Sequence, residues 1–204
     1  MEDLERILHQ YLVEDLVDLK KSRVGYPILM TVFAGVELLG ALLTEGQHGT
    51  DRDDFVHYWT KYLYPPSKRP KTDEEAEIIY NGVRHGVMHH FFPKGQVGIT
   101  GTDPGAHMTC RDDGVLILDT KVLVDDFVGA YEKHVVKILN TPTGIPSREL
   151  MQKRLDDIRA AGRKKMGNLY AVFPGALAAT SQVAESKAIS SASAVGVSGP
   201  TGPV

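Results

Sequence analysis

Hydrophobic side chains recur at helical spacing through the first part of the chain. In residues 3–21 they are three or four positions apart, and charged side chains fill the other face, so an amphipathic helix is predicted. After a break at 23–25, Pro27 suits the first turn of a second helix, which runs to about Thr44. This second helix is apolar nearly all round, which predicts burial at the centre of the fold.

Two further helices follow, separated by a loop. Residues 53–64 are rich in aromatic side chains, and Asp51 precedes them as a helix cap. The stretch "PPSKRPK" is a loop by composition. Thr72, with Glu75 three residues later, forms a capping-box pattern. A fourth helix is therefore predicted over 73–90.

The pattern changes to short β-prone segments at about 96–119. "QVGIT", "AHMTC" and "VLILD" alternate with turn residues, and "RDDG" between the last two is typical of a hairpin turn. We therefore expect a small β-hairpin or a three-stranded flap inserted among the helices.

Helical spacing returns at 121–139, and a more polar helix is predicted over 147–161. Towards its end the chain is rich in Ala, Ser, Gly and Val, which is typical of a low-complexity tail. The sequence thus predicts a mainly α fold with a small β-hairpin insert. We expect one helical domain over 1–162 and a tail over 163–204.

The distribution of net charge along the chain disfavours one class of binding partner, duplex nucleic acid. The 204 residues carry a net charge of -3, but residues 163–204 alone carry +3, so the remainder carries -6. An acidic body disfavours broad binding to duplex nucleic acid, which needs many phosphate contacts. It leaves open a local pocket for RNA or a nucleotide.

The compartment follows from three features. Cys110 is the one cysteine, so no intrachain disulfide can form, and the acidic start "MEDLERILHQ" is unlike a secretory signal. The apolar stretch 26–43 approaches the length of a membrane span, but Glu37 lies near its middle, where a carboxylate would be costly in lipid. We expect a cytoplasmic protein with no membrane span.

The segment "NGVRHGVMHHFF", residues 81–92, gathers an arginine and three histidines at the end of the fourth predicted helix. In the simplest interpretation these cations complement the helix dipole while the apolar side chains between them pack inward.

A metal site is a second interpretation. His85 and His89 are four residues apart and share a helix face, which is a zinc-binding geometry. A further ligand would come from the hairpin, as His107, Cys110 or Asp112. No HExxH pattern is present and none of these three has a diagnostic spacing, so we predict no metal.

Catalysis on a phosphodiester is the third interpretation. RNA cleavage needs a group that moves a proton and a cation that stabilises the charge on the phosphorus centre. A histidine can serve as the first and an arginine as the second.

A family resemblance favours this third interpretation. "YNGVRHGVMHHFFPKG" resembles the signature helix of HEPN domains, in which an arginine and a polar residue are followed by three residues and a histidine. Arg84, His85 and His89 match it in order. "FAGVELLGALL" is similar to the family's second core helix, where an inward acidic residue corresponds to Glu37. The resemblance covers about residues 1–140 and is greatest to small bacterial HEPN-like proteins.

The resemblance implies a helical bundle that forms a homodimer or larger assembly, with two Arg/His sites in one cleft. Many HEPN proteins resemble metal-independent endoribonucleases that act as toxins or in phage defence, and others keep the fold as binding or scaffolding modules. By this analogy Arg84 holds the scissile phosphate and His89 is the general acid or base, while His85 assists and Glu37 orients them. One toxin branch has a tyrosine where this chain has Phe91, so a role for that hydroxyl is ruled out.

We therefore expect RNA as a ligand, Lys94 as a further phosphate contact and no cofactor. A protein partner such as an antitoxin or effector is also expected. The alternative is a non-catalytic interaction module in an oligomeric assembly, in which Arg84 and Glu37 form a structural pair.

Overall fold

The structure is a computed structural model that describes residues 2–22, 25–44, 51–67, 72–84, 86 and 97–172. Of these residues 75% are helical, and a small three-stranded sheet accompanies the helices. The prediction of a mainly α fold with a small β insert is thereby confirmed. The chain divides into two units, Met1–Leu155 and Asp156–Val204, and the packing described below is that of the first unit.

The first part of the chain folds into helices close to the predicted bounds. π-helical turns, each widened by one residue, interrupt or end several of them. The elements are α1 (Glu2–His9), η1 (Gln10–Glu14), α2 (Asp15–Lys21), α3 (Gly25–Leu43), α4 (Asp51–Tyr58), η2 (Trp59–Leu63), α5 (Thr72–Ile79) and η3 (Tyr80–Arg84), where η1, η2 and η3 are π-helical. Asp51 begins α4 rather than capping it. The fourth predicted helix is described as far as Arg84, and most of its predicted second half lies outside the described residues.

The second part contains the sheet and the remaining helices. Its elements are β1 (Val97–Thr100), the short 3-10 helix η4 (Pro104–Ala106), β2 (Thr109–Cys110), β3 (Leu116–Asp119), α7 (Thr120–Ala130), the π-helical η5 (Tyr131–Val135), α8 (Val136–Leu139) and α9 (Arg148–Val172). Here α7, η5 and α8 form the one continuous helix that was predicted over 121–139.

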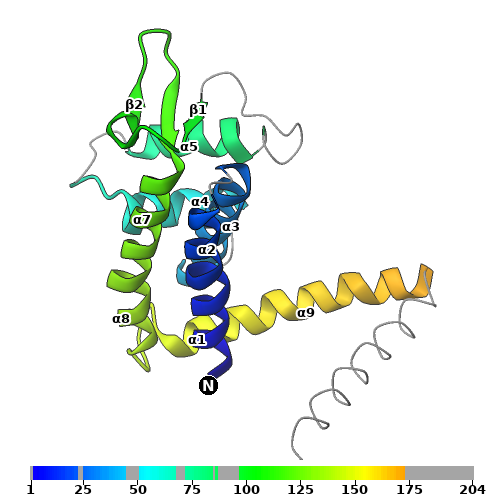
Figure 1. The fold of residues 1–204 in the computed structure, drawn as a ribbon. Helices are drawn as coiled ribbons and strands as arrows, with labels where there is room; N and C mark the ends of the chain where they lie inside the picture. The colour runs from blue at the N-terminus through cyan, green and yellow to red at the C-terminus, as the bar shows by residue number, and fades with distance from the viewer. Residues whose placement is uncertain are drawn as a thin grey trace, which may run out of the picture. The chain divides into compact units, whose positions relative to one another are not determined.

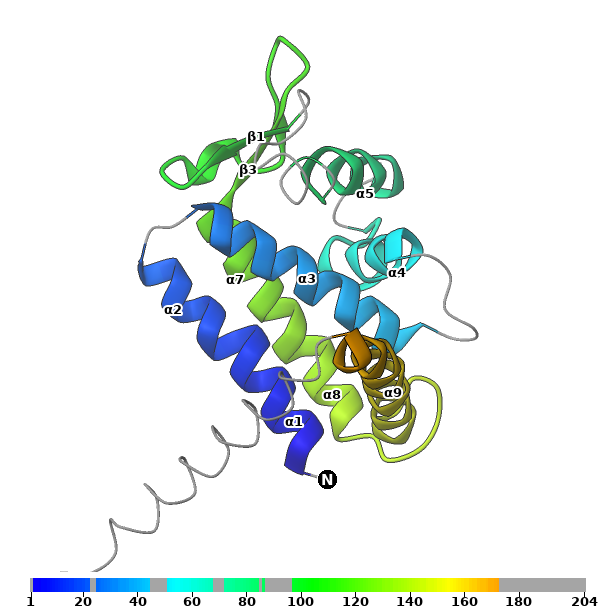
Figure 2. The same cartoon turned by 90° about the vertical axis from the view of Figure 1, so that its right-hand side faces the viewer.

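Helix α3 is the centre of the first unit. It contacts α2, α4 and α7, and Figure 2 shows α2, α3 and α7 side by side. Ten of its nineteen residues are buried, as its apolar composition predicted. By length and composition alone α3 is also the one helix in the described ranges that could cross a membrane. The expected cytoplasmic location therefore stays a prediction.

The sheet lies at one end of the helices (Figure 1) and has the order β1-β3-β2. Strands β2 and β3 form the predicted hairpin, with Gly114 in its turn at a φ of 81°. Strand β1 pairs with β3 in parallel, from Val97 opposite Leu116 to Thr100 opposite Asp119. This parallel pair places the ends of β1 and β3 together where α7 begins.

The last helix is longer than predicted. The Ser147 hydroxyl accepts a hydrogen bond from the Leu150 amide, so the predicted start is confirmed. The predicted end at Ala161 is wrong, because α9 continues to Val172. Between these points Arg, Lys, Met, Leu and Ala, all good helix formers, outweigh two glycines, and the low-complexity composition begins only later.

Two glycines allow α3 to approach its neighbours closely. A Cβ atom at Gly40 would lie 1.9 Å from the Asp54 carbonyl oxygen in α4. At Gly35 it would lie 2.8 Å from the Phe127 ring in α7. The first contact is with backbone, which cannot move aside as a side chain can, so α3 and α4 must separate if Gly40 is replaced.

We expect Gly40→Ala to lower the free energy of unfolding by about 3 kcal/mol, because the added methyl overpacks the contact with α4. Gly129→Ala is the matched control, since Gly129 lies in α7 with no heavy atom within 4 Å of an added Cβ. That variant should gain about 0.5–1 kcal/mol from helix propensity. Urea unfolding measures both, and equal stability of the two variants would contradict the close α3–α4 packing.

Candidate functional site

The predicted Arg/His motif begins at the edge of the described structure. Arg84 is the last residue of η3, and the structure describes its backbone only. His85, His89 and Lys94 lie outside the described residues. Their predicted roles are therefore still predictions.

The helix that leads into the motif is anchored in the core. Tyr80 and Val83 are buried, and the Tyr80 ring lies 5.3 Å from the ring of Phe55 in α4, measured between centroids. Arg84 directly follows Val83, so its backbone lies beside this buried face. The anchoring fixes where the motif starts.

Glu37 is half-buried on α3. Phe33 and Gly40, four residues before it and three after, both contact α4, and residues at these spacings share a helix face. Glu37 is thus on the side of α3 that packs against α4, and α4 in turn contacts the helix of Arg84 through Phe55. Its predicted pairing with Arg84 or His89 is not tested by the described residues.

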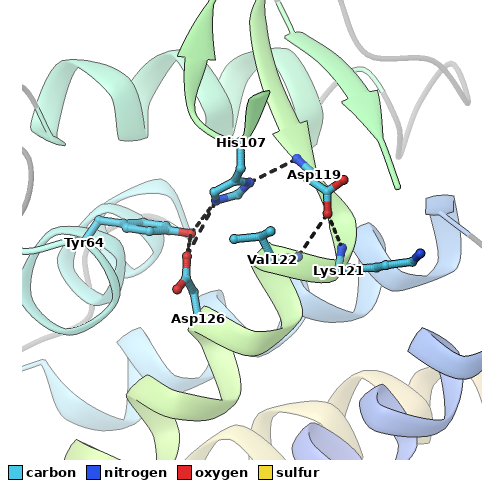
Figure 3. Close-up of polar contacts among 6 residues, drawn as sticks. All are labelled: Tyr64, His107, Asp119, Lys121, Val122 and Asp126. Atoms are coloured by element: carbon cyan, nitrogen blue, oxygen red, sulfur yellow. Dashed lines mark hydrogen bonds and ion pairs between the residues drawn. The ribbon is translucent and has the colours of Figure 1, made fainter. Parts of the chain in front are cut away.

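A different polar cluster joins the sheet to the helices (Figure 3). The Tyr64 hydroxyl, just after η2, donates to Asp126 Oδ2 in α7 at 2.6 Å. The same hydroxyl lies 2.9 Å from His107 Nε2, in the loop before β2. The His107 side chain is 7% exposed and that of Asp126 is 36% exposed, so the cluster opens to solvent on the Asp126 side.

The backbone fixes the direction of these hydrogen bonds. The Asp119 amide donates to His107 Nδ1 at 3.0 Å, so Nδ1 is unprotonated and the ring proton is on Nε2. His107 Nε2–H therefore donates to the Tyr64 oxygen, whose own proton goes to Asp126. The direct distance of 3.6 Å from Nε2 to Asp126 Oδ2 leaves the hydroxyl as the bridge.

Asp119 links this cluster to the start of α7. Its side chain is fully buried and accepts from the amides of Lys121 and Val122 at 3.0 and 3.1 Å, which caps the helix. It also accepts from the Asp103 amide at 3.2 Å. One residue thus ends β3, caps α7 and orients His107.

The cluster is a structural clamp, judged by its chemistry. Both His107 nitrogens have hydrogen-bond partners, so the ring cannot take up a proton or bind a metal without losing one of them. His107 is therefore not available as the third ligand of the metal interpretation. Cys110 and Asp112 are exposed, and no cluster of three metal-binding side chains occurs within the described ranges.

Little in the sequence indicates this clamp. Tyr64 and His107 are 43 positions apart, and His107 and Asp126 are 19 apart, so no local motif contains them. The available signal was Asp119, which stands between a strand pattern and a helix pattern as an N-cap residue.

Comparison of the chain with protein-family models, with curated proteins and with solved structures finds no match in any of the three.

We expect Tyr64→Phe to destabilise the protein by about 1–3 kcal/mol, because the change leaves His107 Nε2–H and Asp126 without their bridge. Tyr58→Phe is the matched control. Tyr58 is fully buried, its hydroxyl has no hydrogen-bond partner among the described residues, and burial raises its pKa far above the usual value. The control should be neutral or slightly stabilising in urea unfolding, and equal losses in both variants would contradict the bridge.

The tautomer of His107 gives an independent test. We expect the neutral form with its proton on Nε2 at pH 7, because the Asp119 amide occupies Nδ1. Long-range proton–nitrogen correlation spectra of the imidazole rings distinguish the tautomers, and His107→Gln assigns the signal. A proton on Nδ1 would overturn the proposed direction of the network.

Proposed function

We propose that this protein is a cytoplasmic HEPN-like protein that binds RNA and cleaves it without a metal ion, in stress response or antiphage defence. Arg84 would hold the scissile phosphate and His89 would transfer the proton, with His85 and Lys94 as further polar contacts. The enzyme would act as a homodimer or larger assembly that brings two such sites together.

The observation that carries the proposal is the Arg84, His85 and His89 pattern in the sequence, together with the core anchoring of the turn that ends in Arg84. A catalytic arginine must be held in place to stabilise charge in a transition state. Because Tyr80 and Val83 are buried, they hold in place the backbone that leads into Arg84. The motif also begins in a π-helical turn, a distortion that often accompanies functional sites.

The position of Glu37 adds support. It is on the side of α3 that packs on α4, and the Phe55 ring of α4 contacts Tyr80, at the start of the turn that ends in Arg84. A half-buried carboxylate in this part of the bundle suits the proposed role of orienting Arg84 or His89.

The test uses the purified protein and total cellular RNA in the presence of EDTA. We expect endonucleolytic cleavage by the wild type and a loss of about 100-fold or more in Arg84→Ala and in His89→Ala, since each removes one part of the chemistry. His9→Ala and Lys133→Ala are matched controls, because both side chains are exposed and outside the motif. Both controls should cleave as the wild type does.

Other outcomes separate the alternatives. Cleavage that EDTA abolishes would contradict the metal-independent mechanism. RNA binding that depends on Arg84, without cleavage, would support an RNA-binding protein and contradict the proposed enzymatic activity. Neither cleavage nor binding across several RNA pools would overturn the proposal and favour an interaction module.

A further inference from the structure

A cavity of about 640 Å³ lies where the sheet meets the helices. The end of α2, the start of α3, residues 99–102 at and just after the end of β1, and the first turn of α7 all contribute to its lining. It is therefore built from three regions of the chain that are distant in sequence: residues 20–28, 99–102 and 120–121. Its volume is within the range of pockets for small-molecule ligands, roughly 300–1,000 Å³.

Thr120 gives the cavity a polar wall. Its side chain is 2% exposed, and its hydroxyl has no hydrogen-bond partner among the described residues. Glycines border it on two sides: a Cβ at Gly101 would lie 3.3 Å from the Thr120 hydroxyl oxygen, and one at Gly25 would lie 4.0 Å from its methyl. Both glycines also line the cavity. A buried hydroxyl beside open space is suited to a ligand that supplies its missing hydrogen bond.

The charges that line the cavity are positive. Lys20 and Lys121 belong to the lining, and the described residues of the lining include no carboxylate. Lys20 is held in place by an ion pair with Asp125 in α7. The Lys121 ammonium has no ion-pair partner in the part of the chain that the structure describes. The lining thus has a deficit of negative charge that a bound anion would correct.

The first backbone amides of α7 are not available to bind an anion in the cavity. The Asp119 carboxylate already occupies the amides of Lys121 and Val122. An anion in the cavity would therefore be bound by side chains: the two ammonium groups and the hydroxyls of Thr100, Thr102 and Thr120. So many donors suit a phosphate group, which has three strong acceptor oxygens.

We propose that this cavity binds a small molecule of nucleotide size through a phosphate monoester group. Lys121 and Thr120 hold the phosphate, and Lys20 adds its charge from the end of α2. Tyr26, Ile28 and Ile99 offer an apolar surface to the rest of the ligand. The proposal concerns a site other than the Arg84 motif and stands whether or not the protein cleaves RNA.

Titration calorimetry with the intact protein tests the site, with each of the four nucleoside 5′-monophosphates, the matching neutral nucleosides and inorganic phosphate as probes. We expect at least one monophosphate to bind at one site per chain, at least tenfold more tightly than its nucleoside. Inorganic phosphate should compete for it. Lys121→Met should weaken this binding about tenfold or more, because it removes the unpaired ammonium.

Two further variants complete the test. Thr120→Val is nearly isosteric and should weaken binding severalfold by removing the hydroxyl alone. Lys133→Met removes an exposed lysine outside the cavity lining and should bind as the wild type does. The absence of saturable binding to every phosphate probe up to about 10 mM would overturn the proposal. So would monophosphate binding that Lys121→Met leaves unchanged or that Lys133→Met weakens equally, whatever the result of the RNA cleavage assay.

Discussion

The close packing around α3 is the constraint on which the rest of the first unit depends. The helix is buried along much of its surface, and Gly40 brings it against the backbone of α4 while Gly35 accommodates Phe127 of α7. Because protein interiors are close-packed, shifting α3 would displace both neighbours together. The helix that leads to Arg84 packs on α4, and the sheet directly precedes α7. The packing of α3 against α4 and α7 therefore positions both the start of the Arg84 motif and the cavity beside the sheet.

Asp119 connects the packed helices to the sheet. Its carboxylate caps α7, while its amide fixes the His107 ring that bridges through Tyr64 to Asp126. The next two residues, Thr120 and Lys121, line the cavity at the end of β1. The clamp and the cavity therefore share the first turn of α7. A loss of the clamp should loosen the cavity wall, whereas filling the cavity leaves the hydrogen bonds of the clamp in place.

Periodicity along the chain was enough to predict most helices, because burial on one face imposes a local pattern, as in 3–21 and 121–139. The hairpin was predictable from "RDDG" because turn residues between two β-prone segments are also a local pattern. Contacts between distant segments were not. The parallel pairing of Val97 with Leu116 and the Tyr64 clamp depend on how the whole chain packs. The cavity likewise needs three distant regions of the chain together, so no motif in the sequence indicates it.

The Arg84 motif shows the opposite relation, since its pattern is local and visible in the sequence, while its environment would depend on the proposed assembly. The fold provides a fixed start, through Tyr80 on Phe55, and a carboxylate at Glu37 on the side of α3 that packs on α4. If a second copy of the chain completes the proposed site, each copy needs to contribute little more than an arginine whose backbone is held in place. The cavity, by contrast, has its polar wall and both ammonium groups within one chain. The proposed RNA cleavage at the motif should therefore depend on protein concentration through the proposed assembly, whereas the proposed phosphate binding in the cavity should not.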